Sequence, residues 1–272
     1  MDPNGRALIT GASRGIGRAL AGELAERGFD VLATMRDPAM AGSLADHPRI
    51  EIAPLDLTRP AQWPQPSSLR VLVNCGGADT PHRPLEFDSP AEWRAVFETN
   101  FFGPVELMRA AVPALRAAGG GVIVNVTSIS VLAPVPFYAL YRSSKAALAA
   151  VGESLRTELA PFGIRLLEVL PGPIDTDMFA ASGEPPPALD HEEYRVAAAH
   201  AHKGREAIES AKSSVDVAAR QIADAILDDD APLKVSCDPV SEQMLSAWRG
   251  ASSEEEYQRT FWPAFVPPRG RT

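Results

Sequence analysis

The sequence predicts an α/β protein built on a doubly wound parallel sheet of seven strands, in a three-layer α/β/α arrangement. Short apolar runs alternate with helical stretches along the 272 residues, which is the pattern of parallel strands joined by helical crossovers. Continuous aliphatic runs such as Val122-Ile123-Val124 suit strands that are covered on both faces. The sequence has no internal repeat, so we expect a single domain over residues 1–272.

Seven short apolar segments are expected to form the strands. They are Arg6–Thr10, Val31–Met35, Ile50–Pro54, Arg70–Asn74, Gly121–Thr127, Ile164–Leu170 and Leu233–Cys237. The main helices are expected at Arg18–Gly28, Pro90–Ala118, Tyr138–Pro161, Val215–Asp228 and Glu242–Arg249. Right-handed crossovers place a ligand crevice at the carboxyl ends of the strands. Four residues at such ends are therefore expected in one cleft: Thr10, Asn74, Ser128 and Pro171.

A glycine-rich turn follows the first strand, in the order Gly11-Ala12-Ser13-Arg14-Gly15-Ile16-Gly17. Between a strand and a helix, such a turn brings backbone N–H groups and a helix N-terminus close to a phosphate. Glycine lets the backbone approach the ligand without a Cβ atom in the way. The turn is a candidate phosphate site, although a tight connection between strand and helix would use glycine too.

Tyr141 and Lys145 lie four residues apart in a stretch expected to be helical, so they share one face of the helix. A free phenol has a pKa of about 10, and a nearby ammonium favours the phenolate and lowers that pKa. Ser128 ends a preceding strand, where its hydroxyl can hydrogen-bond a substrate oxygen. The three residues predict proton transfer to or from an alcohol or carbonyl. The alternative interpretation is a pair of ordinary neighbours on a helix surface.

Taken in order, these motifs resemble those of the short-chain dehydrogenase/reductase family, whose sheet is Rossmann-like. The likeness runs from about residue 6 to about residue 237. It implies a dinucleotide-binding and catalytic domain with these cofactor positions: Gly11, Ser13, Arg14, Gly15, Ile16, Gly17, Asp56, Leu57, Asn74, Gly76, Tyr141, Lys145, Pro171, Gly172 and Thr176. Two departures from the family pattern are Cys75-Gly76, in place of Asn-Ala, and Thr127, in place of a frequent serine.

The resemblance also implies four catalytic residues, which are Asn100, Ser128, Tyr141 and Lys145. Tyr141 would be the general acid in reduction and the base in oxidation. Lys145 would lower its pKa and hold the nicotinamide ribose, and Ser128 would orient the substrate oxygen. Asn100 would position a water that links Lys145 to solvent.

The implied activity is NAD(P)(H)-dependent hydride transfer between nicotinamide and a ketone, aldehyde or secondary alcohol. Two other classes stay open: a non-catalytic dinucleotide-sensing relative, and an isomerase or dehydratase that uses a bound nucleotide. A sensing relative typically loses the tyrosine or the lysine, whereas Tyr141 and Lys145 are both present. An isomerase or dehydratase would need an extra acid–base group, and the sequence offers none in a motif. We therefore expect an oxidoreductase.

Arginines near the end of the second strand favour NADP(H) over NAD(H). Relatives that prefer NAD usually carry an acid there, which accepts from the ribose hydroxyls. This sequence has Thr34-Met35 at that point, followed by Arg36, and Arg14 lies in the glycine turn. Two guanidinium groups that converge would bind a 2′-phosphate strongly. Asp37 keeps NADH open, and solvated surface cations are the plainer interpretation.

Composition excludes several classes of partner and site. A net charge of −9 argues against nucleic acid, and the chain has no apolar run long enough for a membrane span. The N-terminus lacks the features of a signal peptide. Cys75 and Cys237 form no disulfide framework or metal spacing, so we expect a cytoplasmic protein. The histidines at 191, 200 and 202 are not spaced to share a helix face, so no metal site is expected.

Residues 178–213 are expected to form a mobile lid over the substrate, because Gly183 and three prolines interrupt the chain just after apolar Met178-Phe179. A surface excursion is the alternative. The lining is expected to favour a small apolar carbonyl or alcohol and to draw on Phe102, Ile129, Leu132, Ala133, Pro134, Val135, Phe137, Tyr138, Met178 and Phe179.

The aromatic residues of the tail, residues 250–272, suggest that it docks on its own cleft or on a partner subunit. The Tyr138–Pro161 helix is apolar on more than one face, which suggests a second buried surface. The family pairs equivalent helices in oligomers. We therefore expect a homodimer or homotetramer that uses this helix and Pro90–Ala118. High helix propensity of alanine is the simpler explanation.

Overall fold

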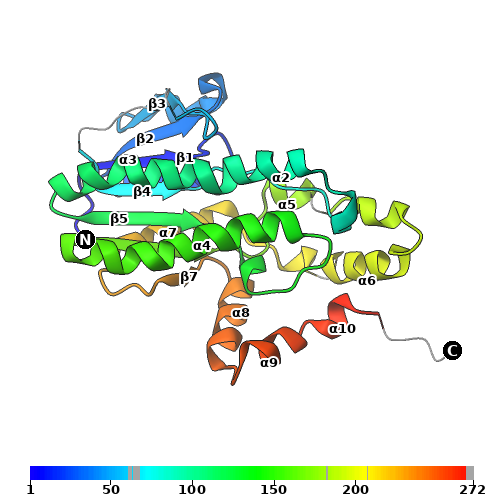
Figure 1. Ribbon diagram of the computed structural model, residues 1–272. Helices are drawn as coiled ribbons and strands as arrows, with labels where there is room; N and C mark the ends of the chain where they lie inside the picture. The colour runs from blue at the N-terminus through cyan, green and yellow to red at the C-terminus, as the bar shows by residue number, and fades with distance from the viewer. Residues whose placement is uncertain (61–62, 64–67, 182, 207, 268–272) are drawn as a thin grey trace.

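A seven-stranded parallel sheet forms the centre of the computed structural model (Figure 1), which describes the chain except residues 61–62, 64–67, 182, 207 and 268–272. The strand order is β3-β2-β1-β4-β5-β6-β7. The strands are β1 (Arg6–Thr10), β2 (Asp30–Met35), β3 (Ile50–Pro54), β4 (Val71–Asn74), β5 (Gly121–Val126), β6 (Ile164–Leu170) and β7 (Lys234–Ser236). The order reverses between β1 and β4, where a doubly wound sheet opens its ligand crevice. The predicted fold class is confirmed.

Helices cover both faces of the sheet. One buried cluster joins the inner sides of α1 (Gly15–Glu26) and α7 (Val215–Leu227) to one face. The other face packs against α3 (Gly103–Ala117) and α4 (Ala139–Leu159) through a second cluster. Strand residues alternate between the two clusters, as the two-residue period of a strand requires. Ile9 belongs to the first cluster and its neighbour Leu8 to the second, and both are fully buried.

The single helix expected over Pro90–Ala118 is divided. It consists of α2 (Pro90–Phe97), a π-helical turn (Glu98–Phe102) and α3. Pro104 lies at the start of α3 and has no N–H group to donate back into the preceding turn, which favours a break in the hydrogen-bond pattern there. Wide turns of this kind occur often at functional sites, and this one carries the buried Asn100.

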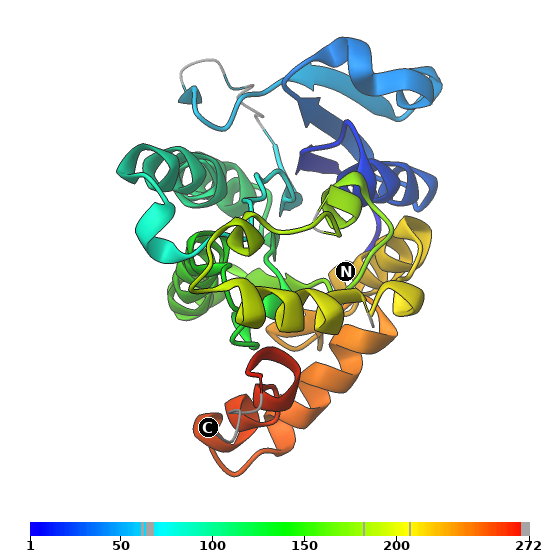
Figure 2. The same cartoon turned by 90° about the vertical axis from the view of Figure 1, so that its right-hand side faces the viewer.

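The segments after β6 lie beyond the carboxyl ends of the strands (Figures 1 and 2). They include α5 (Asp177–Ala181) and α6 (Arg195–Glu206), with short 3₁₀ turns at Pro187–Asp190 and Glu209–Ala211. Ser182 and Ala207, which belong to the expected lid, are outside the described residues. The segment therefore lies at the end of the sheet where the crevice opens.

The C-terminal residues form an arm of three short helices, α8 (Pro239–Gly250), α9 (Glu254–Arg259) and α10 (Trp262–Phe265). Tyr257 is buried in a cluster with Leu132, Leu170 and Leu245. At its far end the arm reaches α6, where His200 Nε2 is hydrogen-bonded to the carbonyl oxygen of Pro263 at 2.9 Å. The described part of the tail thus packs on its own chain. Residues 268–272 of the expected tail are outside the described part.

Candidate active site

Two glycines of the turn, Gly11 and Gly17, are packed too closely against the backbone to be replaced by a residue with a side chain. Gly11 has a φ of +72°, and a Cβ atom there would lie 2.7 Å from the Cα of Gly76. A Cβ atom on Gly17 would lie 2.5 Å from the carbonyl oxygen of Gly11. Helix α1 begins at Gly15, three residues earlier than expected, so its N-terminus lies inside the turn. Free N–H groups and the helix dipole are therefore directed to the place where a phosphate would bind.

Thr10 fixes this turn to the end of β4. Its hydroxyl accepts hydrogen bonds from the backbone N–H groups of Cys75 and Gly76, each at 3.0 Å. Gly76 stands where the family usually has alanine, and a Cβ atom there would lie 3.0 Å from the Cδ1 of Leu57, the far end of a flexible side chain. This departure therefore leaves the local structure intact.

The two arginines expected at a 2′-phosphate are both exposed. Arg14 Nη1 lies 3.3 Å from Asp177 Oδ2, and Arg36 follows β2 directly. Hydrogen bonds from Thr58 lower the pKa of Asp56, and the charges of Arg59 and Arg36 lower it further. The carboxylate of Asp37 accepts a hydrogen bond from the N–H of Ala39 at 3.0 Å, as the cap of a 3₁₀ helix.

Three of the expected catalytic side chains meet at the carboxyl end of β5. Ser128 follows that strand, while Tyr141 and Lys145 are buried on α4. The Nζ of Lys145 lies 5.7 Å from the centre of the Tyr141 ring and donates to the carbonyl oxygen of Val126 at 2.9 Å. The Oγ of Ser128 accepts from Ser130 Oγ at 2.9 Å and from Ser130 N at 3.2 Å, which orients the serine.

Asn100 is fully buried and its side-chain amide is occupied by the protein. Its Oδ1 accepts from the N–H of Ala78 at 2.7 Å, and its Nδ2 donates to the carbonyl oxygen of Ala78 at 2.9 Å and to Ser144 Oγ at 3.0 Å. The amide therefore clamps the loop after β4 onto α4. Among the described residues, this amide bonds to Ala78 and Ser144 and makes no hydrogen bond to Lys145.

Burial is the largest cause of the pKa shifts of Tyr141 and Lys145. It raises the pKa of Tyr141, and the negative charge of Asp79 raises it further, while a hydrogen bond with Ser128 opposes the shift. Burial lowers the pKa of Lys145 to about 8, against the charges of Cys75 and Asp79. In this structure the tyrosine pKa is therefore raised rather than lowered as expected, because loss of hydration on burial is the largest cause.

Asp79 is the residue near the site that the sequence motifs do not identify. It lies two residues after Gly77, and the hydroxyl of Tyr138 donates to its carboxylate. The ring of Tyr138 stacks on that of Tyr141, with centres 4.6 Å apart and planes at 20°. Burial raises the pKa of Asp79, while Tyr138, Thr80 and nearby cations oppose the shift. The sequence feature that could have identified Asp79 is an acidic residue two positions after the Asn-Cys-Gly-Gly segment.

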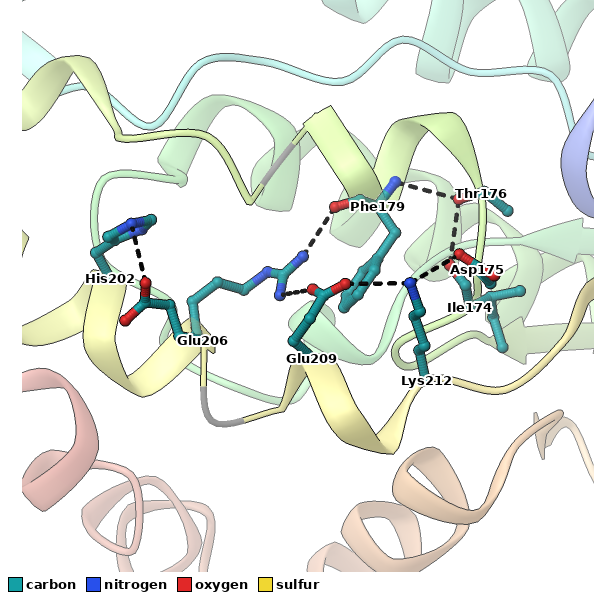
Figure 3. Close-up of polar contacts among 9 residues, drawn as sticks. Ile174, Asp175, Thr176, Phe179, His202, Glu206, Glu209 and Lys212 are labelled. Carbon is teal, nitrogen blue, oxygen red and sulfur yellow. Dashed lines mark hydrogen bonds and ion pairs between the residues drawn. The ribbon is translucent and has the colours of Figure 1, made fainter.

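Asp238 is a second residue that the motifs miss. It is 1% exposed, and its carboxylate accepts from the N–H of Gly172 at 2.7 Å and from the N–H of Ser241 at 2.9 Å. It thereby joins the Pro171-Gly172 turn to the start of α8. On the same side, Thr176 Oγ1 accepts from Phe179 N at 3.1 Å (Figure 3). A Cβ atom on Gly15 would lie 3.2 Å from the Cγ2 of Thr176. The glycine turn, expected at the phosphates, therefore lies next to Thr176, expected at the nicotinamide.

The residues expected to form the apolar lining lie in several different environments. Leu132 belongs to the cluster that holds the C-terminal arm, and Ile129 packs against that cluster. Phe102 is 49% exposed on the π-helical turn. Phe137, with a φ of +60°, packs edge-on against Tyr194 at 5.8 Å. A residue that is not glycine is strained in this conformation, and the strain lies directly before Tyr138.

Among the residues that the structure describes, no group of three or more His, Cys, Asp or Glu side chains is placed to hold a metal ion. No helix in the described part of the chain is long and apolar enough to cross a membrane.

Comparison with known proteins agrees with this geometry. A family model for the short chain dehydrogenases matches residues 6–186. The chain is 38% identical over 190 residues to the short-chain dehydrogenase PC-15 of Penicillium crustosum, covering 66% of this chain and 69% of that protein.

Two solved structures are similar over nearly the whole chain. A short chain dehydrogenase from Burkholderia cenocepacia J2315 in complex with NADP is 29% identical, with a TM-score of 0.76 and coverage of 98% of this chain and 100% of that one. A short-chain dehydrogenase from Streptomyces avermitilis is 28% identical, with a TM-score of 0.77 and coverage of 95% and 96%. The chain therefore belongs to the short-chain dehydrogenase/reductase family of NAD(P)-dependent oxidoreductases.

Proposed function

We propose that the protein reduces a carbonyl group with NADPH and that Tyr141 is the general acid. The observation that carries this proposal is the meeting of Ser128, Tyr141 and Lys145 at the end of β5, beside the glycine turn. Burial raises the pKa of Tyr141, so the phenol holds its proton at neutral pH. A protonated phenol suits the donation of a proton, which is the direction of reduction.

The residues of the crevice fit a dinucleotide. The glycine turn offers backbone N–H groups where a Cβ atom on Gly11 or Gly17 would clash, so Gly11, Ser13, Arg14, Gly15, Ile16 and Gly17 would hold the phosphates. Asp56, Leu57, Asn74 and Gly76 would surround the adenine half. Pro171, Gly172 and Thr176, with Tyr141 and Lys145, would hold the nicotinamide half. When bound, the reduced nicotinamide supplies the hydride.

The chain's own groups manage the proton and the developing charge. Ser128 donates a hydrogen bond to the carbonyl oxygen and orients it, and Tyr141 transfers its phenolic proton to that oxygen. The ammonium of Lys145 stabilises the phenolate that remains, and this charge stabilisation is strong because the site is buried. Asn100 holds the loop after β4 in place. In oxidation the same groups act in reverse.

The proposal is tested by following NADPH oxidation with a panel of ketones and aldehydes, with NADH in parallel. Apolar straight-chain and aromatic ketones belong in the panel, since we propose a substrate with an apolar body. Turnover of any of these with NADPH supports the proposal. Tight NADPH binding without turnover of any carbonyl would instead indicate a nucleotide-sensing protein.

We propose that NADPH is preferred over NADH. Arg36 is exposed at the end of β2, where the ribose of the adenine half would lie, and Arg14 extends from the glycine turn. Asp37, which could have accepted from ribose hydroxyls, already accepts from Ala39 N. The similar protein from Burkholderia cenocepacia was solved with NADP, which supports the same choice.

Replacing Arg36 with alanine is expected to weaken NADPH binding by about tenfold or more and to leave NADH binding nearly unchanged. A hydrogen bond to a charged group contributes roughly 1.5–3 kcal/mol, and only NADPH carries the 2′-phosphate. Fluorescence titration of both nucleotides measures the two Kd values. Arg49→Ala, an exposed arginine that pairs with Asp30, is the control. Equal losses for both nucleotides in Arg36→Ala would show that Arg36 does not bind the phosphate.

We propose that residues 178–213 close over the substrate as a lid. In this structure the segment is held by contacts at its two ends. Lys212 lies 3.1 Å from Asp175 and 3.3 Å from Glu209, as Figure 3 shows. These ion pairs are largely exposed, and exposed pairs contribute only about 0–1 kcal/mol. Opening would also break the hydrogen bond from Ala188 N to the carbonyl oxygen of His82 and the one between His200 and Pro263.

Hydrogen exchange is expected to slow in the described parts of 178–213 only in the ternary complex. A closed lid excludes water from hydride transfer and contacts the substrate. Exchange is compared for the free enzyme, the NADPH complex and the complex with NADPH and a substrate analogue, with α3 as the internal control. Equal protection in all three states would identify the segment as a fixed part of the fold.

We propose a cytoplasmic location, since Cys75 and Cys237 are free thiols.

We also propose a homodimer or homotetramer that uses α3 and α4. Ala146, Ala147 and Val151 of α4 are only partly buried in the single chain, and the neighbouring Phe102 is exposed. Light scattering at micromolar concentration is expected to show an oligomer, and Ala147→Glu is expected to dissociate it. A monomeric wild-type protein would rule out this assembly.

A further inference from the structure

A cleft of about 380 Å³ lies beside the catalytic residues. One wall is the loop after β4, with Asp79, Thr80, Pro81 and His82, and the other is the lid segment, with Ala181, Glu184, Pro185, Pro186 and Pro187. The cleft adjoins the reaction centre through Tyr138. The Tyr138 hydroxyl donates to Asp79, and its ring stacks on Tyr141. The His82 ring lies 4.3 Å from the ring of Tyr138.

The loop wall carries polar atoms without partners. Thr80 Oγ1 and His82 Nε2 are shut off from solvent and have no hydrogen bond to any described residue. Most buried polar atoms in native proteins are hydrogen-bonded, so two unpaired ones on one loop call for an explanation. The lid closes on this loop, since Ala188 N donates to the carbonyl oxygen of His82 at 3.2 Å. Lid opening would uncover the unpaired atoms to an entering molecule.

The chemistry of the two walls differs. Burial lowers the pKa of His82 to about 4, and the charges of Arg205 and His202 add to the shift. The imidazole is therefore neutral at physiological pH, with one nitrogen donor and one acceptor. Thr80 likewise both donates and accepts. The three consecutive prolines of the lid wall have no N–H groups and present apolar rings.

A hydroxyl group matches the loop wall best, because it is uncharged and can donate and accept at once. A cation could use only the acceptor atoms of this wall and would leave the donor hydrogens of Thr80 and His82 unpaired. An anion would meet the carboxylates of Asp79 and Glu184, which both line the cleft. An apolar group would leave Thr80 Oγ1 and His82 Nε2 unpaired, which is costly in a buried site.

We propose that Thr80 and His82 recognise a hydroxyl group of the substrate, so that the substrate is a hydroxylated carbonyl compound. The apolar body of the substrate lies against the lid prolines, and its carbonyl reaches Ser128 and Tyr141. This assignment rests on the proposed carbonyl reduction.

The test uses pairs of straight-chain ketones that differ only by a hydroxyl group at the end remote from the carbonyl, over a series of chain lengths. The wild-type enzyme is expected to show a kcat/KM about tenfold higher for the hydroxylated member of the best pair, the worth of one well-placed hydrogen bond. Thr80→Val and His82→Phe keep the side-chain shape, and each is expected to remove most of this preference. Both are expected to leave the parent ketone and the Kd for NADPH unchanged. Thr157→Val, on the exposed side of α4, is the matched control.

Two outcomes would overturn the assignment: no wild-type preference in any pair, or variants that lose activity on both members equally. Calorimetric binding of each ketone to the NADP⁺-loaded protein separates this failure from failure of the proposed function. Binding that prefers the hydroxylated ketone and depends on Thr80, without turnover, would support the recognition site and reject carbonyl reduction. Turnover without a preference for the hydroxylated ketone would support carbonyl reduction and reject the recognition site.

Discussion

Replacing Tyr141 with phenylalanine is expected to reduce carbonyl turnover by about 10²–10⁴-fold, the usual contribution of a general acid. The phenol is the group placed to give the substrate oxygen a proton, because Lys145 is turned towards the carbonyl oxygen of Val126. Phenylalanine keeps the ring and its stacking on Tyr138, so the site should retain its shape. The Kd for NADPH is expected to stay within about threefold of wild type, since the phenol supplies only one of many cofactor contacts.

Tyr138→Phe is the matched control for that experiment. It removes the hydroxyl that donates to Asp79 but leaves the stacked ring in place, three residues before Tyr141. We expect it to lose far less turnover than Tyr141→Phe. Initial rates with NADPH and the best ketone measure both variants. Turnover of Tyr141→Phe within about threefold of wild type would sink the assignment of the general acid.

Replacing Lys234 with methionine is expected to destabilise the fold by about 3–5 kcal/mol, the range for breaking a buried ion pair by removing one partner. Lys234 Nζ lies 2.6 Å from Glu168 on β6 and 2.8 Å from Glu153 on α4. The side chain of Glu168 is only 3% exposed. Without the lysine, its carboxylate would be buried without a counter-charge, close to a second carboxylate. Urea unfolding measures the free energy of unfolding.

A double-mutant cycle tests the origin of this loss. Lys234→Met combined with Glu168→Gln is expected to recover much of the stability, because the uncompensated charge is gone. Lys203→Met, at an exposed position of α6, is the control and is expected to change stability by less than about 0.5 kcal/mol. A loss below about 1 kcal/mol in Lys234→Met would mean that water reaches Glu168 and that the pair is not truly buried.

The sheet and the order of motifs were predictable because both depend on local pattern. Apolar runs such as Val122-Ile123-Val124 define strands, and short right-handed crossovers then fix where their ends meet. The predicted β3, β6 and β1 boundaries match the structure. The meeting of Ser128 with Tyr141 followed from the same logic, since one follows β5 closely and the other lies on the next α-helix.

The remaining features depend on contacts between residues distant in sequence. Asp238 contacts Gly172, which lies 66 positions away in the sequence, and no sequence periodicity predicts such a contact. The raised pKa of Tyr141 results from burial by several elements together. Leu132 follows Ser128 closely, yet it faces the C-terminal arm because Leu245 and Tyr257 pack on it. The π-helical turn before Pro104 likewise brings Asn100 to Ala78 and Ser144, contacts that helix propensity does not encode.

The contact between the C-terminal arm and α6 couples the arm to the segment that we propose as a lid. His200 on α6 is hydrogen-bonded to Pro263 of the arm, whereas the glycine turn follows β1 and Tyr141 and Lys145 lie on α4. Substitutions in α10 would therefore act through α6 on the entrance that we propose for substrates. Substitutions at the start of α8 would instead reach the Pro171-Gly172 turn, because Asp238 accepts from the N–H of Gly172.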